Sequence, residues 1–146
     1  RARRAPPHDT SGTDRLGPGC ADTTPPSGTW LTDPAAPTRR AAAEAYTRAG
    51  VTTPSDHIEV VELTAPTPAL HAPVLDALGL DGPGAVVNPS GGVRSSYPGV
   101  ANGALRLLEV VHALEHSGAG HGVAQSSDPL TGTIADTATV LVVEGV

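Results

Sequence analysis

Residues 85–92 read AVVNPSGG, the most specific signal in the chain. Ala85, Val86 and Val87 are small or β-branched apolar residues of the kind that fill a strand. The Asn-Pro and Gly-Gly pairs that follow them are turn signals. Further along, a long helix is predicted because apolar side chains recur at helical spacing, namely Leu105, Leu108, Val111, Ala113 and Leu114. This helix is largely apolar, so we expect it to be buried.

Upstream of this unit the sequence predicts a helix and then a strand. Alanines at helical spacing predict a helix over 35–49, with Asp33 as a cap, Pro34 as a first-turn proline and Gly50 as the stop. Residues 57–63 read HIEVVEL, a pattern typical of a buried strand.

Three further elements complete the pattern. After a loop at 64–68, apolar residues from Leu70 to Leu78 predict another helix, which Gly79 closes. Two strands are predicted after the long helix, one at 123–126 and one at 137–143 that is rich in β-branched and aliphatic residues. Helices that alternate with strands in this way predict an α/β domain with helices layered on a sheet.

Residues 1–33 have a different composition. They hold five of the prolines among glycine, serine, threonine and aspartate, with little apolar periodicity. Such a segment buries too little apolar surface to offset the entropy lost on ordering, so we expect 1–33 to be flexible or bound to a partner. The domain itself is predicted to span 34–146.

Composition excludes several classes of function. The net charge of −6 and the lack of a basic cluster beyond the first four residues disfavour nucleic-acid binding. A single cysteine, Cys20, excludes an internal disulfide and a cysteine metal site, and it fits a reducing cytoplasm. No apolar run approaches the roughly 20 residues that cross a bilayer, so we expect a soluble protein without a membrane partner.

Several motifs taken together resemble the C-terminal domain of thiolases. Asn88-Pro89-Ser90-Gly91-Gly92, followed by a loop of small residues and a long helix, is similar to the family's NPSGG segment and the GHPxGxxG loop after it. Residues 62–67, ELTAPT, fall where sterol-carrier-type thiolases have an EVHDCF-like loop, and residues 77–80, ALGL, match their EALGL in spacing. Residues 43–50, AEAYTRAG, resemble the family's helix that ends in AG.

The resemblance covers about three quarters of the chain and implies a specific fold and chemistry. The fold implied is the second half of a thiolase, with helices layered on a mixed, five-stranded-type sheet. The chemistry implied is acyl transfer or carbon–carbon bond cleavage on a coenzyme A thioester, which is a substrate and not a tightly bound cofactor. A first-half chain or homologous subunit would complete the site, because the nucleophilic cysteine of thiolases lies in that half.

Departures from the thiolase pattern matter for the mechanism. The loop from Gly92 to Gly103 is one residue short, and its register puts Tyr97 on the active-site histidine; Thr131 falls on the second cysteine and Thr64 on the Asn or His of the middle loop. A threonine does not act as the base that thiolysis needs near neutral pH.

The branch of the family that tolerates these losses is the thiolase-like aldolases that cleave steroid side-chain thioesters. They use tyrosines and work with a partner that carries an OB-fold and a zinc ribbon. The resemblance thus implies retro-aldol cleavage with Tyr97 as general acid/base and Tyr46 as a second catalytic candidate. Asn88, Gly91 and Gly92 are the candidates for the mouth of the substrate site, where the two glycines permit close approach of the backbone.

Other interpretations stay open at this point. Tyr97 is also compatible with a surface tyrosine on a loop, and Tyr46 with a packing residue on an alanine-rich helix. An acyltransferase subunit and a non-catalytic, degenerate thiolase-like module are the alternative functions. His112, His116 and His121 approach ligand spacing, but we expect no metal site.

Overall fold

A computed structural model describes residues 20–22, 33–128 and 137–145. Two short 3-10 turns, η2 (Gly92–Arg94) and η3 (Gly99–Ala101), precede the longest helix. The strands and α-helices run in the order β1 (Cys20–Asp22), α1 (Ala36–Ala49), α2 (Pro54–His57), β2 (Val60–Glu62), α3 (Pro68–Ala77), β3 (Val86–Val87), α4 (Asn102–Ser117), β4 (His121–Asp128) and β5 (Thr137–Glu144).

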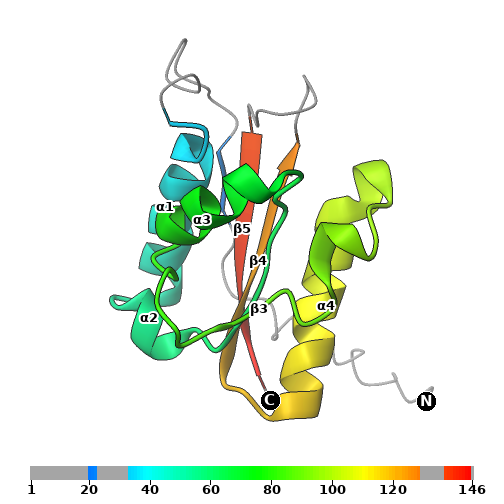
Figure 1. The fold of residues 1–146 in the computed structure, drawn as a ribbon. Coiled ribbons are helices and arrows are strands. Elements are labelled where there is room, and N and C mark those ends of the chain that lie inside the picture. Colours follow the sequence, from blue (N-terminus) through cyan, green and yellow to red (C-terminus); the bar gives the residue numbers. More distant parts are fainter. Residues whose placement is uncertain (1–19, 23–32, 129–136, 146) are drawn as a thin grey trace, which may run out of the picture.

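The strands form one mixed sheet in the order β1-β5-β4-β2-β3 (Figure 1). Strand β2 pairs in parallel with both β3 and β4, whereas β5 pairs antiparallel with β4 and β1. The α/β class that the sequence predicts, with helices on a mixed sheet, is therefore confirmed at this level.

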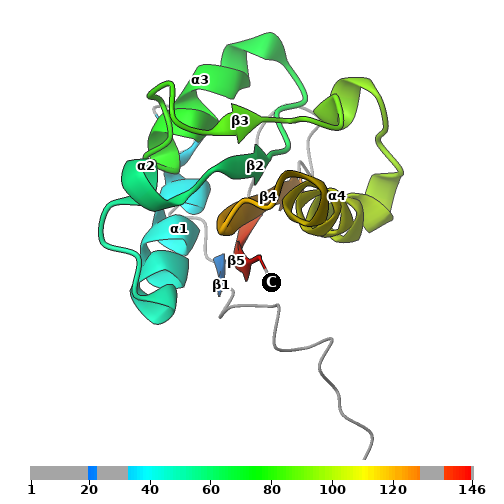
Figure 2. The same cartoon turned by 90° about the horizontal axis from the view of Figure 1, so that it is seen from below.

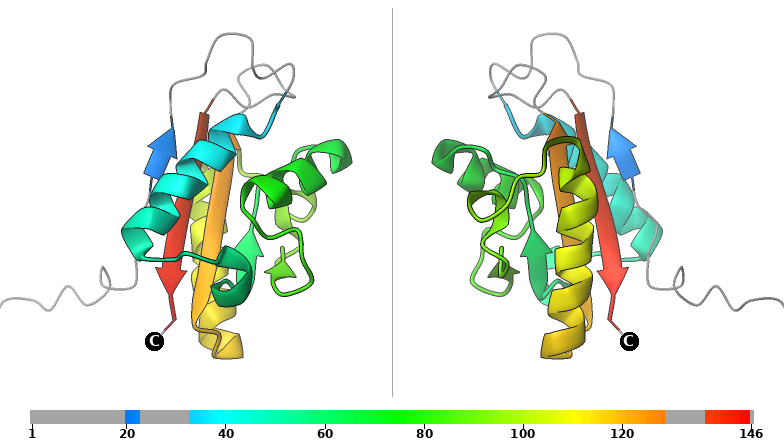
Figure 3. Two further views of the ribbon diagram at one scale, coloured as in Figure 1. Left: turned by 90° about the vertical axis from the view of Figure 1, so that its left-hand side faces the viewer. Right: turned by 90° about the vertical axis from the view of Figure 1, so that its right-hand side faces the viewer.

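Helices cover both faces of the sheet. Helices α1 and α3 lie on one face and α4 lies alone on the other (Figures 2 and 3). This arrangement follows from the right-handedness of crossovers between parallel strands. The crossover from β2 to β3 contains α3 and moves toward the sheet edge, whereas the crossover from β3 to β4 contains α4 and moves back past β2. Because the two crossovers move in opposite directions, their helices lie on opposite faces.

Two clusters of mostly small aliphatic side chains hold the layers together. The larger cluster joins α1 and α3 to the sheet through residues such as Ala41, Val61 and Val140. The smaller cluster joins α4 to the opposite face through Val110 and Leu114. Neighbouring residues of a strand belong to different clusters because successive strand side chains point to opposite faces.

The predicted elements are found, with shifted boundaries. Helix α1 begins at Ala36, its first-turn proline is Pro37 and not Pro34, and Asp33 Oδ1 accepts a hydrogen bond from the Ala35 N–H at 3.1 Å. Gly50 ends α1 with a φ of 72°, as expected. Pro54 opens the short helix α2 ahead of β2, so the strand expected over 57–63 is confined to 60–62.

The burial expected for the long helix is only partly correct. Leu114 is buried, but Leu108 is 64% exposed. Only one face of α4 contacts the sheet, and that face includes the polar residues Asn102 and Arg106. The helix is therefore amphipathic in space although its sequence is mostly apolar.

Within the segment expected to be flexible, Cys20–Asp22 forms the edge strand β1, paired with residues 138–140 of β5. Residues 1–19 and 23–32 lie outside the described residues, so the expectation for 1–33 as a whole stays a prediction. Among the described ranges, no helix is both long enough and apolar enough to cross a membrane.

Candidate functional site

The carboxyl ends of the three parallel strands meet at one edge of the sheet. There β2 leads through residues 63–67 to α3, on one face, and β3 leads through residues 88–101 to α4, on the other. Loops that leave neighbouring strands toward opposite faces open a crevice between them, and ligands of α/β proteins bind in such crevices. This edge is therefore the candidate ligand-binding region.

A fully buried ion pair lies directly beneath these loops. Arg106 Nη1 of α4 donates to Glu62 Oε2 at 3.0 Å, and both side chains have no exposed area. The pair also holds the loop: the Ser90 N–H donates to Glu62 Oε1 at 2.8 Å, and Arg106 Nη2 donates to the Ser96 carbonyl at 3.1 Å. Glu62 and Arg106 thus connect the end of β2 and helix α4 to the loop that contains Ser90 and Ser96.

A second buried polar network joins β2, β4 and the first turn of α4. Asn102 Nδ2 donates to Thr64 Oγ1 at 2.7 Å, and the Thr64 N–H donates to Gln125 Oε1 at 2.8 Å. Gln125 Nε2 in turn donates to Thr38 Oγ1 of α1 at 3.1 Å. Buried amides and hydroxyls of this kind fix the relative positions of the elements that carry them, because an unpaired partner is costly.

Tyr97 lines a cavity of about 280 Å³ at the amino end of α4. Tyr97 is 51% exposed and lies between η2 and η3, a few residues before the helix. Residues of β4 and β5 also line the cavity, among them the hydroxyl-bearing Ser126 and Thr139 and the apolar Leu141. The cavity combines several hydroxyl groups with an apolar wall, a combination suited to a small acyl group that carries oxygen.

Tyr46 has a different environment. It is only 7% exposed within the larger aliphatic cluster, and its hydroxyl donates to the Leu78 carbonyl at 2.9 Å. Burial raises the pKa of Tyr46 well above the ordinary value of 10.0. A phenol that is buried, paired and hard to ionise packs α1 against α3, and Tyr46 lines neither of the two described cavities.

Two of the three predicted substrate-site residues line a second cavity of about 650 Å³, between the 65–68 loop and the NPSGG segment, and the third, Gly92, does not. Asn88 and Gly91 line it. Asn88 has a φ of 49° and its Oδ1 accepts from the Leu63 N–H at 2.8 Å. Gly92 is buried with a φ of 60°, and a Cβ there would lie 2.8 Å from Asn88 Cγ. The structure therefore separates Tyr97 from the predicted substrate residues.

Sequence reasoning missed the buried polar residues that organise this edge. Asn102, Arg106, Val110 and Leu114 form the buried stripe of α4 at four-residue spacing. That spacing was available in the sequence as a signal, since a polar residue in register with two apolar anchors faces the same surface as they do.

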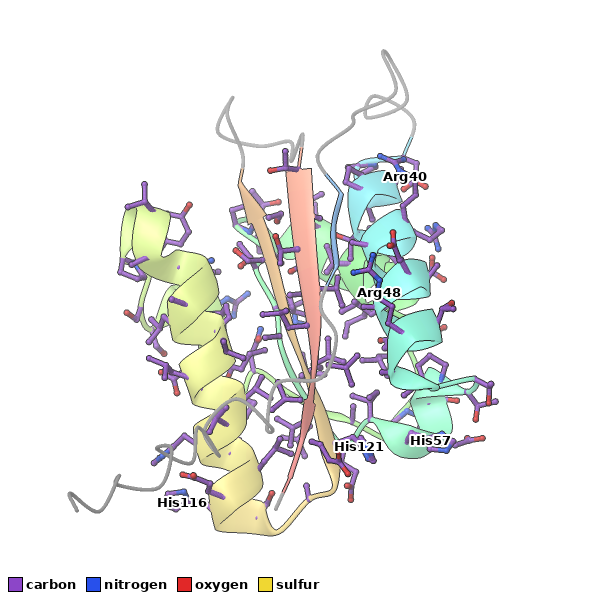
Figure 4. The ribbon with its side chains drawn as sticks, turned by 180° about the vertical axis from the view of Figure 1, so that it is seen from behind. Arg40, Arg48, His57, His116 and His121 are labelled. Atoms are coloured by element: carbon purple, nitrogen blue, oxygen red, sulfur yellow. The ribbon has the colours of Figure 1, made fainter. Side chains whose placement is uncertain are left out.

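The histidines do not form a metal centre in the described ranges, where no group of three or more potential ligands is close enough to hold an ion. His112 and His116 stack on α4 with ring centroids 4.0 Å apart. His116 and His57 lie on opposite sides of the sheet (Figure 4). Thr131, which the thiolase register places on the second cysteine, lies outside the described residues.

Comparison with known proteins adds no identity. No protein-family model matches this sequence. No protein of curated function matches it either.

Proposed function

We propose that this chain is a thiolase-like half-enzyme that cleaves a carbon–carbon bond in a β-hydroxyacyl coenzyme A thioester. The proposal includes the finer fold that the motifs imply, the C-terminal half of a thiolase on a five-stranded-type sheet. It also includes the setting that they imply, lipid or steroid side-chain degradation in the cytoplasm.

The observation that carries the proposal is the position of Tyr97. Tyr97 lines a cavity at the amino end of α4 whose lining also includes the hydroxyl-bearing residues Ser126 and Thr139. Tyr97 is also the residue that falls on the thiolase active-site histidine in the sequence register. A general acid/base must reach its substrate, and Tyr97 is accessible whereas the only other tyrosine, Tyr46, is buried.

The reaction proposed needs no covalent intermediate. Tyr97, activated as a base, removes the proton of the substrate's β-hydroxyl group. The bond between Cα and Cβ breaks, Cβ becomes a carbonyl carbon, and the electron pair remains on Cα as the enolate of the shortened thioester. Protonation of that enolate releases the second product and balances the reaction.

We propose that a partner completes the site. The cavity beside Tyr97 is open, and the helix that borders it covers only part of its sheet face, so Leu141 and Thr139 remain partly exposed. The thiolase resemblance supports a first-half chain or homologous subunit as this partner, together with an OB-fold zinc-ribbon protein.

A non-catalytic role in partner binding is the second candidate. It is favoured by the exposed apolar side chains Tyr97, Val100 and Leu108, which occur in and just before the first half of α4. In this interpretation Tyr97 contributes contact area and its hydroxyl is dispensable.

The test is co-expression with a thiolase first-half chain and an OB-fold zinc-ribbon protein, followed by an assay of thioester cleavage. We expect Tyr97→Phe to reduce kcat at least a hundredfold, within the range that a general acid/base contributes. Tyr46→Phe is the matched control, because it removes the other phenol and leaves the cavity unchanged. Equal rates for Tyr97→Phe and the native protein would exclude the catalytic role, and a complex that forms without any cleavage would favour the second candidate.

A further inference from the structure

The second cavity lies where the topology of the sheet favours a ligand. It opens between the loops that follow β2 and β3, and those loops lead to helices on opposite faces of the sheet. Crevices at such switch points are the usual ligand sites of open α/β sheets. The cavity that Tyr97 lines is a separate one, because the two sets of lining residues share no member.

The polar groups around this cavity are mainly donors. Its lining contains the guanidinium of Arg94, the ring of His71, the hydroxyl of Thr67 and the amide of Asn88, and no Asp or Glu. The Asn88 amide is oriented by its Oδ1, which accepts from the Leu63 N–H, and Nδ2 meets no acceptor among the described residues. The lining thus offers donors and a positive charge.

Arg94 has no role elsewhere in the described structure. It is exposed at the end of η2 and forms no ion pair or hydrogen bond with another described residue. By contrast, Arg39, Arg48 and Arg106 all pair with carboxylates. In a chain with a net charge of −6, an unpaired arginine beside a cavity without carboxylates creates a local positive potential.

We propose that this cavity binds the phosphate group of a small-molecule ligand. A guanidinium presents two parallel N–H donors to the oxygens of a phosphate. The hydroxyl of Thr67 and the amide Nδ2 of Asn88 supply neutral donors for the remaining oxygens, and His71 adds a further donor. Apolar side chains such as Pro66 and Val93 border the cavity and suit the organic part of the ligand.

The identity of the molecule that carries the phosphate rests on the proposed function. A coenzyme A thioester bears a 3′-phosphate and would bring it to this edge of the sheet. Phosphate binding itself does not depend on catalysis or on a partner, so it remains testable if thioester cleavage is never observed.

The experiment is a titration of the isolated full chain with inorganic phosphate at constant ionic strength set by chloride. Calorimetry gives the affinity, and the ring resonances of the histidines locate the site. We expect saturable binding that shifts His71 and not His116, and an Arg94→Gln variant that binds phosphate at least tenfold more weakly. Arg48→Gln, on α1 (Figure 4) and outside the lining of this cavity, is the matched control and should bind as the native chain does.

Two further ligands distinguish the source of the phosphate. If coenzyme A binds more tightly than its form without the 3′-phosphate, the site binds the phosphate of coenzyme A. If the two bind equally, the site binds another phosphate compound. Unchanged affinity in Arg94→Gln, a shift confined to other histidines, or no saturable binding at all would overturn the proposal.

Discussion

Helix α4 is held on the sheet at Gly122, and the substitution Gly122→Ala tests that contact. An added Cβ would lie 2.6 Å from Val110 Cγ1 and 3.4 Å from Leu114 Cδ1. Ordinary contacts between carbon atoms are about 3.5 to 4.0 Å, so helix and strand must separate by roughly 1 Å at this point. Val110 is fully buried and β-branched, so it has little freedom to move aside.

The expected cost follows from these distances. Overpacking of a well-packed core costs about 1 to 3 kcal/mol, and replacing glycine returns about 0.4 to 1 kcal/mol by restricting the unfolded chain. We expect the free energy of unfolding to fall by about 1 to 2 kcal/mol, which lowers Tm by roughly 4 to 8 °C for a domain of this size. Urea and thermal denaturation followed by circular dichroism measure both quantities.

Two further variants make the interpretation specific. Gly82→Ala is the control, since nothing lies within 4 Å of a Cβ at that position, and it should leave stability unchanged or raise it slightly. Val110→Ala removes the atom that the new Cβ meets, so the double variant with Gly122→Ala should be less destabilised than the two single variants summed. A neutral Gly122→Ala, or strict additivity in the double variant, would refute this account of the packing.

Three other predictions concern the buried phenol of Tyr46, the buried ion pair and the NPSGG segment. Tyr46→Phe removes the donor to the Leu78 carbonyl and should lower the free energy of unfolding by about 1 kcal/mol. Because folding raises the Tyr46 pKa, native stability is retained below pH 10.0 and falls above it by about 1.4 kcal/mol per pH unit. Unfolding measured against pH should show a smaller decline in Tyr46→Phe. Arg106→Met leaves the Glu62 carboxylate buried without its partner and should cost about 3 to 5 kcal/mol in denaturant titrations, of which Glu62→Gln in the same chain recovers part; no recovery would argue against a charge effect. Gly92→Ala puts a side chain at a φ of 60° and against the Asn88 amide, so we expect about 1 to 3 kcal/mol of destabilisation by thermal melting, and an unaltered Tm would contradict the loop geometry.

Local patterns in the sequence were sufficient for most of the secondary structure. The alanines at helical spacing do lie in a helix, α1, Gly50 ends it, and residues 137–143 form most of β5, as predicted. A predicted boundary was wrong where a neighbouring residue starts another element, as at Pro54, which begins the short helix α2 in front of β2. Periodicity and capping are properties of a few neighbouring residues, so they can be recognised without knowledge of the fold.

The candidate site was less accessible from the sequence. Tyr97, Asn88 and Gly91 do line cavities, but they line two different ones, and a linear motif does not reveal such a division. Tyr46 met the chemical requirement for a catalytic phenol, and only its burial against Leu78 distinguishes it from Tyr97. Accessibility is decided by what other elements cover a side chain.

Local sequence patterns were enough to predict the order of most helices and strands and the turn at residues 88–92. The buried pair of Glu62 and Arg106 beneath that turn joins residues 44 positions apart and became visible only in the folded structure. A charged residue enters a core only when a distant partner neutralises it, and pairing β2 with β4 under α4 is what brings this partner into place.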